Sequence, residues 1–301
     1  MIENPNNYPL PIMLWLLNDS YDHDDRTNAI STTTLLKPIK EIVLSSRITE
    51  PTTIDISKRV KSKLGTAIHD SLEAVFKDKD NLEKLLKLVG YSSSKHLDIH
   101  TENRSEKEID GFIVTGKYDL VINGLLSDYK STTVYGMGRS KKDHILQGSI
   151  YRWLNPELIK EDYMEIIYIL TDWSNKSYDK DYPKDIINPV YYELMSLEDT
   201  EMYIRTKLND IKKYWDSEYN ELPLCNKEEM WQGDPTYKYY KNPNNLTRST
   251  KNFTNYYEAY ARLQKDGNIG TIITHQSKAY KCQFCSGLPL CIQGKTNMEN
   301  K

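Results

Sequence analysis

The chain has 301 residues, 38% of them hydrophobic and 28% charged, a balance typical of globular proteins rather than disordered ones. Its formal net charge is −3, so overall charge gives no reason to expect a nucleic-acid partner. No stretch reaches the roughly 20 apolar residues of a membrane span, and residues 11–17 lack the features of a signal peptide. We therefore expect a cytoplasmic protein with reduced cysteines and no membrane contact.

The N-terminal part of the chain predicts helices. Residues 31–44 predict one helix, with Thr32 or Thr33 as its N-cap. The next helix carries His69 and Glu73, which are four residues apart and share one face beside the apolar stripe. That stripe has the three-and-four spacing of an amphipathic helix and consists of Leu64, Ile68, Leu72, Val75 and Phe76.

The central stretch, residues 116–132, predicts a β-hairpin. Asn123-Gly124 stands between two alternating apolar runs, and both positions of a two-residue hairpin turn require positive φ. The turn position fixes the register of the two strands. In that register Asp119 is opposite Asp128, and their side chains share a face.

Two carboxylates at opposite positions repel each other unless a cation lies between them. Lys130 lies two residues beyond Asp128, so strand alternation puts its side chain on the same face. A hard cation such as Mg²⁺ takes oxygen ligands of this kind and keeps open positions for water and phosphate. The plain alternative is a pair of solvated aspartates on an exposed hairpin.

The second half of the chain continues the pattern of alternating strands and helices. Residues 140–154 predict a helix with a polar face of His144, Gln147 and Tyr151, and residues 163–170 predict a buried strand. Strand, hairpin, helix and strand in this order predict an α/β fold with a mixed central sheet flanked by helices. We expect a helical N-terminal segment, a core and a helical C-terminal region, over residues 1–60, 61–175 and 176–301.

Taken in order, these residues resemble the PD-(D/E)XK nuclease superfamily and, within it, the RecB-like branch. That branch is marked by a helix-borne His, an Asp, a D/E-x-K pair and a following QxxxY helix. The resemblance covers roughly residues 60–175 and implies a restriction-endonuclease-like core. The usual proline before the first Asp is replaced by Tyr118. The matching residues are Gly65, His69, Glu73, Asp119, Asp128, Tyr129, Lys130, Gln147 and Tyr151.

The resemblance implies a divalent-metal-dependent deoxyribonuclease in which Asp119, Asp128 and Lys130 are catalytic. The implied ligands of Mg²⁺ or Mn²⁺ are His69, the two aspartates and the backbone carbonyl of Tyr129. Carboxylates that hold a metal ion beside an open coordination position allow it to activate water. Lys130 would orient that water and stabilise charge on the phosphate. The residues expected to support the ligands or to position DNA are Glu73, Gln147, Tyr151, Arg139 and Lys141.

The four cysteines form a second candidate site. Cys282, Cys285 and Cys291 lie close together near the C-terminus, and Cys225 is the remaining cysteine. Two cysteines separated by two residues are a metal-ligand pattern, and four thiolates could hold Zn²⁺ or an iron–sulfur cluster. Buried free thiols are the plain alternative. Similarity to AddB-type and CRISPR-associated nucleases implies a [4Fe-4S] cluster, although in those proteins the lone cysteine precedes the core, whereas Cys225 follows it.

The resemblance further implies an exonuclease of DNA recombination, repair or processing that acts on DNA ends or single strands. A recombination or single-strand-binding protein would be a further partner, and a phage-encoded protein of this kind would act in the host cytoplasm. Endonuclease and exonuclease modes both remain open. The alternative is a non-catalytic DNA-binding or structural protein built on the same core.

Overall fold

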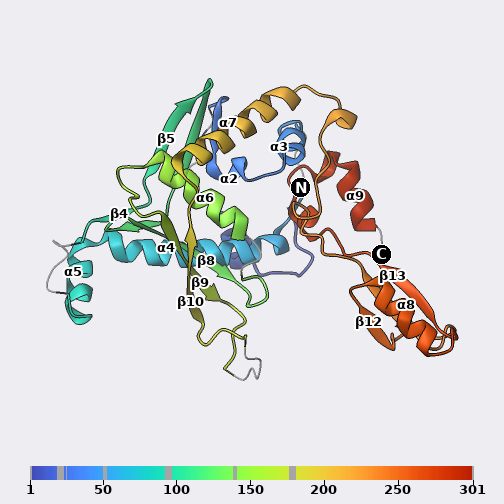
Figure 1. The fold of residues 1–301 in the computed structure, drawn as a ribbon. Helices are drawn as coiled ribbons and strands as arrows, with labels where there is room; N and C mark the ends of the chain where they lie inside the picture. The colour runs from blue at the N-terminus through green and yellow to red at the C-terminus, as the bar shows by residue number, and fades with distance from the viewer. Residues whose placement is uncertain are drawn as a thin grey trace. The chain divides into compact units, whose positions relative to one another are not determined.

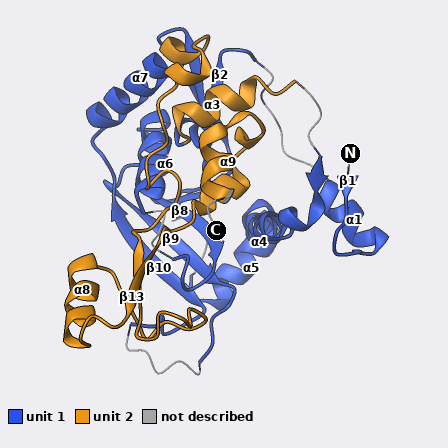
Figure 2. Cartoon of the chain, turned by 90° about the vertical axis from the view of Figure 1, so that its right-hand side faces the viewer, with its two compact units in different colours: residues 1–36, 51–210 blue, residues 37–50, 211–301 orange. Residues whose placement is uncertain are grey.

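The computed structural model describes residues 2–18, 24, 26–49, 53–91, 97–137, 141–175 and 181–299. The chain divides into two compact units, of which unit 1 holds residues 1–36 and 51–210 and unit 2 holds residues 37–50 and 211–301 (Figure 2). The fold class is mixed α/β, as predicted. Within the described ranges no helix is long and apolar enough to cross a membrane. The three segments expected from the sequence differ from these units and stay a prediction.

The central sheet of unit 1 is built from β4 (Ile99–Thr101), β7 (Leu120–Ile122), β8 (Leu125–Thr132), β9 (Tyr163–Leu170) and β10 (Ile187–Glu193). Its strand order is β10-β9-β8-β7-β4 (Figure 1). β8 and β9 run parallel and all other neighbours antiparallel, so the sheet is mixed. Two helices, α4 (Val60–Lys77) and α6 (Lys141–Leu154), pack against it.

The hairpin of β7 and β8 turns at Asn123 and Gly124, where φ is 52° and 88°. Positive φ at both positions is the geometry on which the hairpin prediction depends. The register is the predicted one, with Leu120 opposite Ser127. The ladder begins at Leu120, so Asp119 lies just before it. The expected pairing of the two aspartates is therefore not part of the ladder.

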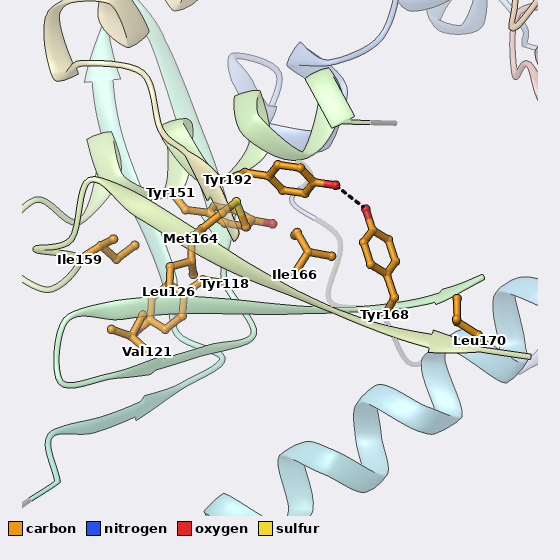
Figure 3. Packing of buried hydrophobic residues seen from close by; sticks show 10 residues of the cluster. All are labelled: Tyr118, Val121, Leu126, Tyr151, Ile159, Met164, Ile166, Tyr168, Leu170 and Tyr192. Atoms are coloured by element: carbon orange, nitrogen blue, oxygen red, sulfur yellow. Dashed lines mark hydrogen bonds between the residues drawn. The ribbon is translucent and has the colours of Figure 1, made fainter. Parts of the chain in front are cut away.

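One face of the central sheet carries the apolar core. Side chains alternate along β8, so Leu126, Asp128 and Lys130 share this face, against which Tyr151 of α6 packs. Asp128 and Lys130 thus lie beside apolar side chains, where a charge is poorly solvated. The buried cluster consists of Tyr118, Val121, Leu126, Tyr151, Ile159, Met164, Ile166, Tyr168, Leu170 and Tyr192 (Figure 3).

The other face of β8 is covered by α4. Gly65 marks the close approach, because a Cβ at this position would lie 3.1 Å from Oγ of Ser131. One turn further along α4, the ring of His69 lies edge-on to the ring of Tyr129, with 6.0 Å between the ring centroids. A side chain in place of Gly65 would crowd the hydroxyl of Ser131 on β8.

A second sheet and a short strand pair complete unit 1 together with four further helices. The second sheet has the order β2-β6-β5, built from β2 (Ala29–Ser31), β5 (Arg104–Ile109) and β6 (Phe112–Lys117). The parallel pair consists of β1 (Ile2–Glu3) and β3 (Ile54–Asp55). The helices are α1 (Leu10–Leu17), α2 (Thr32–Leu35), α5 (Lys79–Leu88) and α7 (Leu197–Tyr214), of which residues 211–214 belong to unit 2.

The single helix predicted over residues 31–44 is wrong. α2 ends at Leu35, and a separate helix, α3 (Ile39–Ser46), follows. Pro38 separates them, because proline lacks the backbone N–H of a helix interior and its ring clashes with the preceding turn. The N-cap of α2 is Ser31 rather than either threonine, and its hydroxyl accepts a backbone N–H three residues on at 3.1 Å.

Unit 2 contains an antiparallel sheet that the sequence did not lead us to expect beside its helices. The sheet has the order β12-β11-β13, built from β11 (Thr236–Tyr240), β12 (Lys251–Phe253) and β13 (Thr271–His275). These strands are short and rich in polar residues, so they lack a clear apolar alternation. Besides α3, the helices of the unit are α8 (Tyr256–Lys265), which packs on the sheet, and α9 (Ile292–Glu299).

Candidate functional site

The peptide groups of Tyr129 form the centre of the candidate site. The β7–β8 ladder starts at Leu120, so at Tyr129 the N–H and C=O on that side have no strand to pair with. Two side chains replace the missing strand. The carboxylate Oδ2 of Asp119 accepts the Tyr129 N–H at 2.9 Å, and Nε2 of His69 lies 2.7 Å from the Tyr129 carbonyl oxygen.

His69 also faces the carboxylate of Asp119. Its Nδ1 lies 3.4 Å from Oδ2 of Asp119. The carboxylate raises the pKa of His69, and burial only partly opposes this shift. The imidazole, between a carbonyl oxygen and a carboxylate, occupies the place where a cation would bind both oxygens. The arrangement fits a metal ion, because a neutral imidazole, a carboxylate and a carbonyl are all competent ligands.

Glu102 joins this group, and the sequence analysis missed it. Ligand atoms of His69, Glu102 and Asp119 all lie within 4.8 Å of one another. Among the described residues no other three His, Cys, Asp or Glu side chains meet this criterion. Glu102 follows β4, which pairs with β7 so that Thr101 is opposite Leu120. The sequence around Glu102 gives only a weak indication of this position, because no local motif shows that β4 pairs with β7.

The backbone of Glu102 is held in an unusual conformation. Its φ is 25°, in the left-handed region that a residue with a Cβ rarely adopts, and its N–H donates to the carbonyl of Asp119 at 3.3 Å. Its carboxylate contacts the ammonium of Lys117. Burial raises the pKa of Glu102, Lys117 opposes the shift and Glu73 adds to it. Glu73 in turn contacts Lys77 one turn along α4.

Asp128 and Lys130 form a separate pair on the core side of β8. Lys130 Nζ lies 2.5 Å from Oδ2 of Asp128, whose side chain is 1% exposed. Burial raises the pKa of Asp128 to about 6 against the opposing charge of Lys130, and Asp119 adds to the rise. Burial lowers the pKa of Lys130, but Asp128 and Asp119 more than offset it, so its pKa is raised. Asp128 is not one of the three residues that converge within 4.8 Å.

The remaining expected site residues lie on or before α6. Nε2 of Gln147 donates to the hydroxyl of Tyr151 at 2.9 Å, one turn along the helix. The ammonium of Lys141 lies 5.6 Å from the centroid of the Tyr192 ring. Arg139, expected to contact DNA, lies outside the described residues. A phosphate contact of Lys141 stays a prediction.

The four cysteines all line one small cavity of unit 2. Burial raises the pKa of Cys225 to about 12 and of Cys285 to about 11. The carboxylate of Glu229 adds to the first shift and that of Glu41 to the second, and the other thiols of the cluster add to both. No three of these sulfurs lie within 4.8 Å of one another, although all four positions are described. A tetrahedral zinc site with Zn–S bonds of about 2.3 Å needs sulfurs about 3.8 Å apart. In every set of three sulfurs at least one pair is therefore farther apart than zinc requires.

A buried cation lines the same cavity. Lys40 of α3 is 2% exposed, and its ammonium lies 4.7 Å from the centroid of the Tyr219 ring. Among the residues that the structure describes, no carboxylate lies within ion-pair distance of this ammonium. A buried ammonium is costly without a negative partner. The buried carboxylate of Glu41 lines the same cavity but pairs with Lys37 rather than with Lys40. Neutral thiols supply no negative charge, whereas metal-bound thiolates would, so the donor set fits a metal–thiolate centre.

No known protein family and no curated protein matches the sequence. Among solved structures, the chain is similar to the crystal structure of SSO0001, with 19% identity, a TM-score of 0.41 and coverage of 62% of this chain and 78% of that one. It is also similar to the crystal structure of a phage-related exonuclease from Haemophilus somnus 129PT, with 18% identity, a TM-score of 0.28 and coverage of 62% and 96%. These scores are too low to assign a function, so the case for one rests on the residues of the site.

Proposed function

We propose that this protein is a divalent-metal-dependent nuclease that hydrolyses phosphodiester bonds in DNA. The observation that carries the proposal is the convergence of His69, Glu102 and Asp119 within 4.8 Å of one another, beside the carbonyl oxygen of Tyr129. A carboxylate–ammonium pair flanks that carbonyl along β8. Oxygen and imidazole ligands beside a fixed ammonium are what phosphodiester hydrolysis needs.

The divalent metal ion would be held by the side chains of His69, Glu102 and Asp119 and by the backbone carbonyl of Tyr129. Bound Mg²⁺ or Mn²⁺ supplies an activated water and neutralises charge on the phosphate and the leaving oxygen. An imidazole among the ligands suits Mn²⁺ better than Mg²⁺. Asp128 is proposed as a further carboxylate ligand, as the family resemblance implies.

Lys130 would supply a second positive charge beside that of the metal ion. Its raised pKa keeps the ammonium protonated at neutral pH. Held by Asp128, the ammonium can donate hydrogen bonds to the attacking water or to a phosphoryl oxygen, and it opposes the negative charge that develops there. Gln147 and Tyr151, hydrogen-bonded to each other on α6, are proposed to position Lys130 or the DNA.

Within this class we propose an exonuclease that acts on DNA ends or single strands in recombination, repair or processing. The ordered series of motifs supports this narrower proposal, together with a recombination or single-strand-binding protein as partner. We also propose a metal centre at the four cysteines. No three of its sulfurs lie within 4.8 Å of one another, which supports a [4Fe-4S] cluster over Zn²⁺, whereas the buried Lys40 would neutralise part of the negative charge of either centre.

A cleavage assay tests the proposed function. End-labelled single-stranded and double-stranded DNA is incubated with the protein in Mn²⁺ and, as a control, in EDTA. We expect shortened products in Mn²⁺ alone, and no products from the Asp119→Ala variant. Lys87→Ala, a change at an exposed residue of α5, should cut like the native chain. Retention of DNA without any cleavage in Mn²⁺ would favour the non-catalytic DNA-binding alternative.

A further inference from the structure

The surface that carries this inference belongs to unit 2, apart from the proposed metal centre of unit 1. α8 starts after the N-cap Asn255, whose side chain accepts the Tyr257 N–H. It packs on the sheet through Ala259 and Leu263. Its first two turns also carry three large aromatic side chains, those of Tyr256, Tyr257 and Tyr260.

These three tyrosines and Tyr237 of β11 form one continuous aromatic surface, which we call the tyrosine ridge. The rings of Tyr256 and Tyr260 are stacked, at 6.2 Å between centroids and an interplanar angle of 17°. Tyr237 on β11 meets Tyr256 edge-on at 5.5 Å, and Tyr257 meets it edge-on at 6.3 Å. The ridge is thus pre-assembled by contacts between its own rings.

The ridge is open to solvent. Tyr256, Tyr257 and Tyr260 are 46%, 80% and 43% exposed. Single exposed apolar residues are common on protein surfaces, but a contiguous group of large rings is a feature of binding surfaces. None of the three hydroxyls of α8 has a hydrogen-bond partner among the described residues. The rings therefore do not owe their positions to structural hydrogen bonds.

Charge around the ridge identifies the class of ligand. Between residues 236 and 275 the chain carries six Lys or Arg against two Asp or Glu, although the whole chain has a net charge of −3. Of the two acids, Asp266 is already bound to Arg262 and to the Tyr239 hydroxyl. Four of the six basic side chains are exposed, namely Lys241, Arg248, Lys251 and Lys265.

One of these cations lies on the same face of the sheet as the ridge. Lys251 pairs in register with Tyr239, two residues along β11 from Tyr237, so all three side chains share the face that α8 covers. The Lys251 ammonium lies 4.9 Å from the centroid of Phe253, the residue opposite Tyr237. Aromatic rings and a nearby ammonium on one face suit a chain of stacked bases joined by phosphates.

We propose that the tyrosine ridge binds single-stranded nucleic acid, with bases stacking on the rings and the surrounding lysines and arginines contacting phosphates. Stacking on protein rings needs unpaired bases, so a duplex of the same sequence is bound more weakly. The site needs no metal ion and no cleavage. The proposal therefore goes beyond the proposed nuclease function and stands or fails separately from it.

Binding of fluorescein-labelled oligo(dT) to the full-length chain in EDTA, measured by fluorescence anisotropy, tests the proposal. The test variants are Tyr257→Ser and the double variant Tyr256→Ser/Tyr260→Ser. We expect each lost ring to weaken binding about five-fold or more. Tyr257→Phe keeps the ring and should bind like the native chain. Tyr91→Ser is the matched control, because Tyr91 is 51% exposed but lies in unit 1.

Oligo(rU) and a duplex of equal length serve as further probes. Similar affinity for oligo(rU) and oligo(dT), with weaker duplex binding, would support recognition by stacking. A preference for one of the two oligonucleotides would indicate whether the natural ligand is RNA or DNA. Thermal unfolding checks that the variants are folded. Unchanged oligo(dT) affinity in the folded double variant would overturn the proposal and leave the ridge as a protein-docking surface. Cleavage in Mn²⁺, measured separately, tests the metal centre proposed in unit 1.

Discussion

The imidazole of His69 lies 2.7 Å from the carbonyl oxygen of Tyr129, so this side chain joins α4 to the free peptide edge of β8. The other ring nitrogen faces Asp119 at 3.4 Å. A metal ion that binds these groups must take the place of the proton on the imidazole, because a histidine ligand is neutral. Helix, strand and metal site are therefore coupled through one residue.

Glu102→Gln should weaken Mn²⁺ binding by about tenfold or more, since it removes a carboxylate from the converging group. The affinity can be measured by electron paramagnetic resonance of free Mn²⁺ in a titration, without any DNA. Glu106→Gln is a matched control on β5, because Glu106 pairs with Arg26 at the surface. Equal Mn²⁺ affinity of the Glu102→Gln variant and the native chain would remove Glu102 from the site.

Lys130→Ala should lower the rate of DNA cleavage by about 10²–10³-fold, as the loss of one positioned charge-stabilising donor does. Mn²⁺ affinity should stay within a few-fold of the native value, because Lys130 binds no metal in this scheme. The two quantities are measured on the same preparation. A Lys130→Ala variant that cuts DNA at the native rate would contradict the proposed catalytic role of this residue.

The hairpin could be predicted because its signal is local. Asn123 and Gly124 carry the turn in their own backbone preferences, and the register follows from the turn. Glu102 could not be predicted in the same way. Its place beside Asp119 depends on the pairing of β4 with β7 and on a left-handed φ that its residue type does not favour.

The buried Lys40 illustrates a second limit of sequence reasoning. α3 was expected to continue the preceding helix, yet it belongs to unit 2, where it lines the cavity of the four cysteines. The cysteine spacing indicated a metal site, but nothing near Lys40 in the sequence indicates that its ammonium is buried there. Contacts between segments so far apart in the chain follow from packing, which no local pattern reports.

His144 makes the stability of the apoprotein depend on pH. Burial, with the charge of Lys130 adding to it, lowers the pKa of His144 to about 4, while in the unfolded chain it is about 6.5. The unfolded state therefore binds the proton first, and stability falls as pH drops from about 6.5 to about 4, then levels off. The loss should be on the order of 3 kcal/mol.

The check on His144 is urea unfolding in EDTA at several pH values between 4 and 7. His144→Gln should show a flatter dependence than the native chain across that window, because the other titrating groups are common to both. A control is His275→Gln, which removes an exposed histidine at the end of β13. Parallel curves for the His144→Gln and native chains would contradict the assigned shift.

Lys40→Met should have opposite effects on the two forms of the protein, because it removes a buried charge and keeps most of the side-chain volume. Without metal, the ammonium has no carboxylate partner among the described residues, so its removal should raise the melting temperature or leave it unchanged. With metal, the thiolates lose their neighbouring cation, so metal content per chain should fall.

Melting temperature and metal content are both measured on anaerobically purified protein. The first is obtained by thermal unfolding after chelation and the second by iron and zinc analysis, and the absorption spectrum distinguishes a cluster from zinc. Lys40→Arg keeps the charge and should retain the metal, whereas Cys282→Ala should lose it. A Lys40→Met variant that loses stability after chelation and keeps its full metal content would show that the ammonium serves packing and not the thiolate centre.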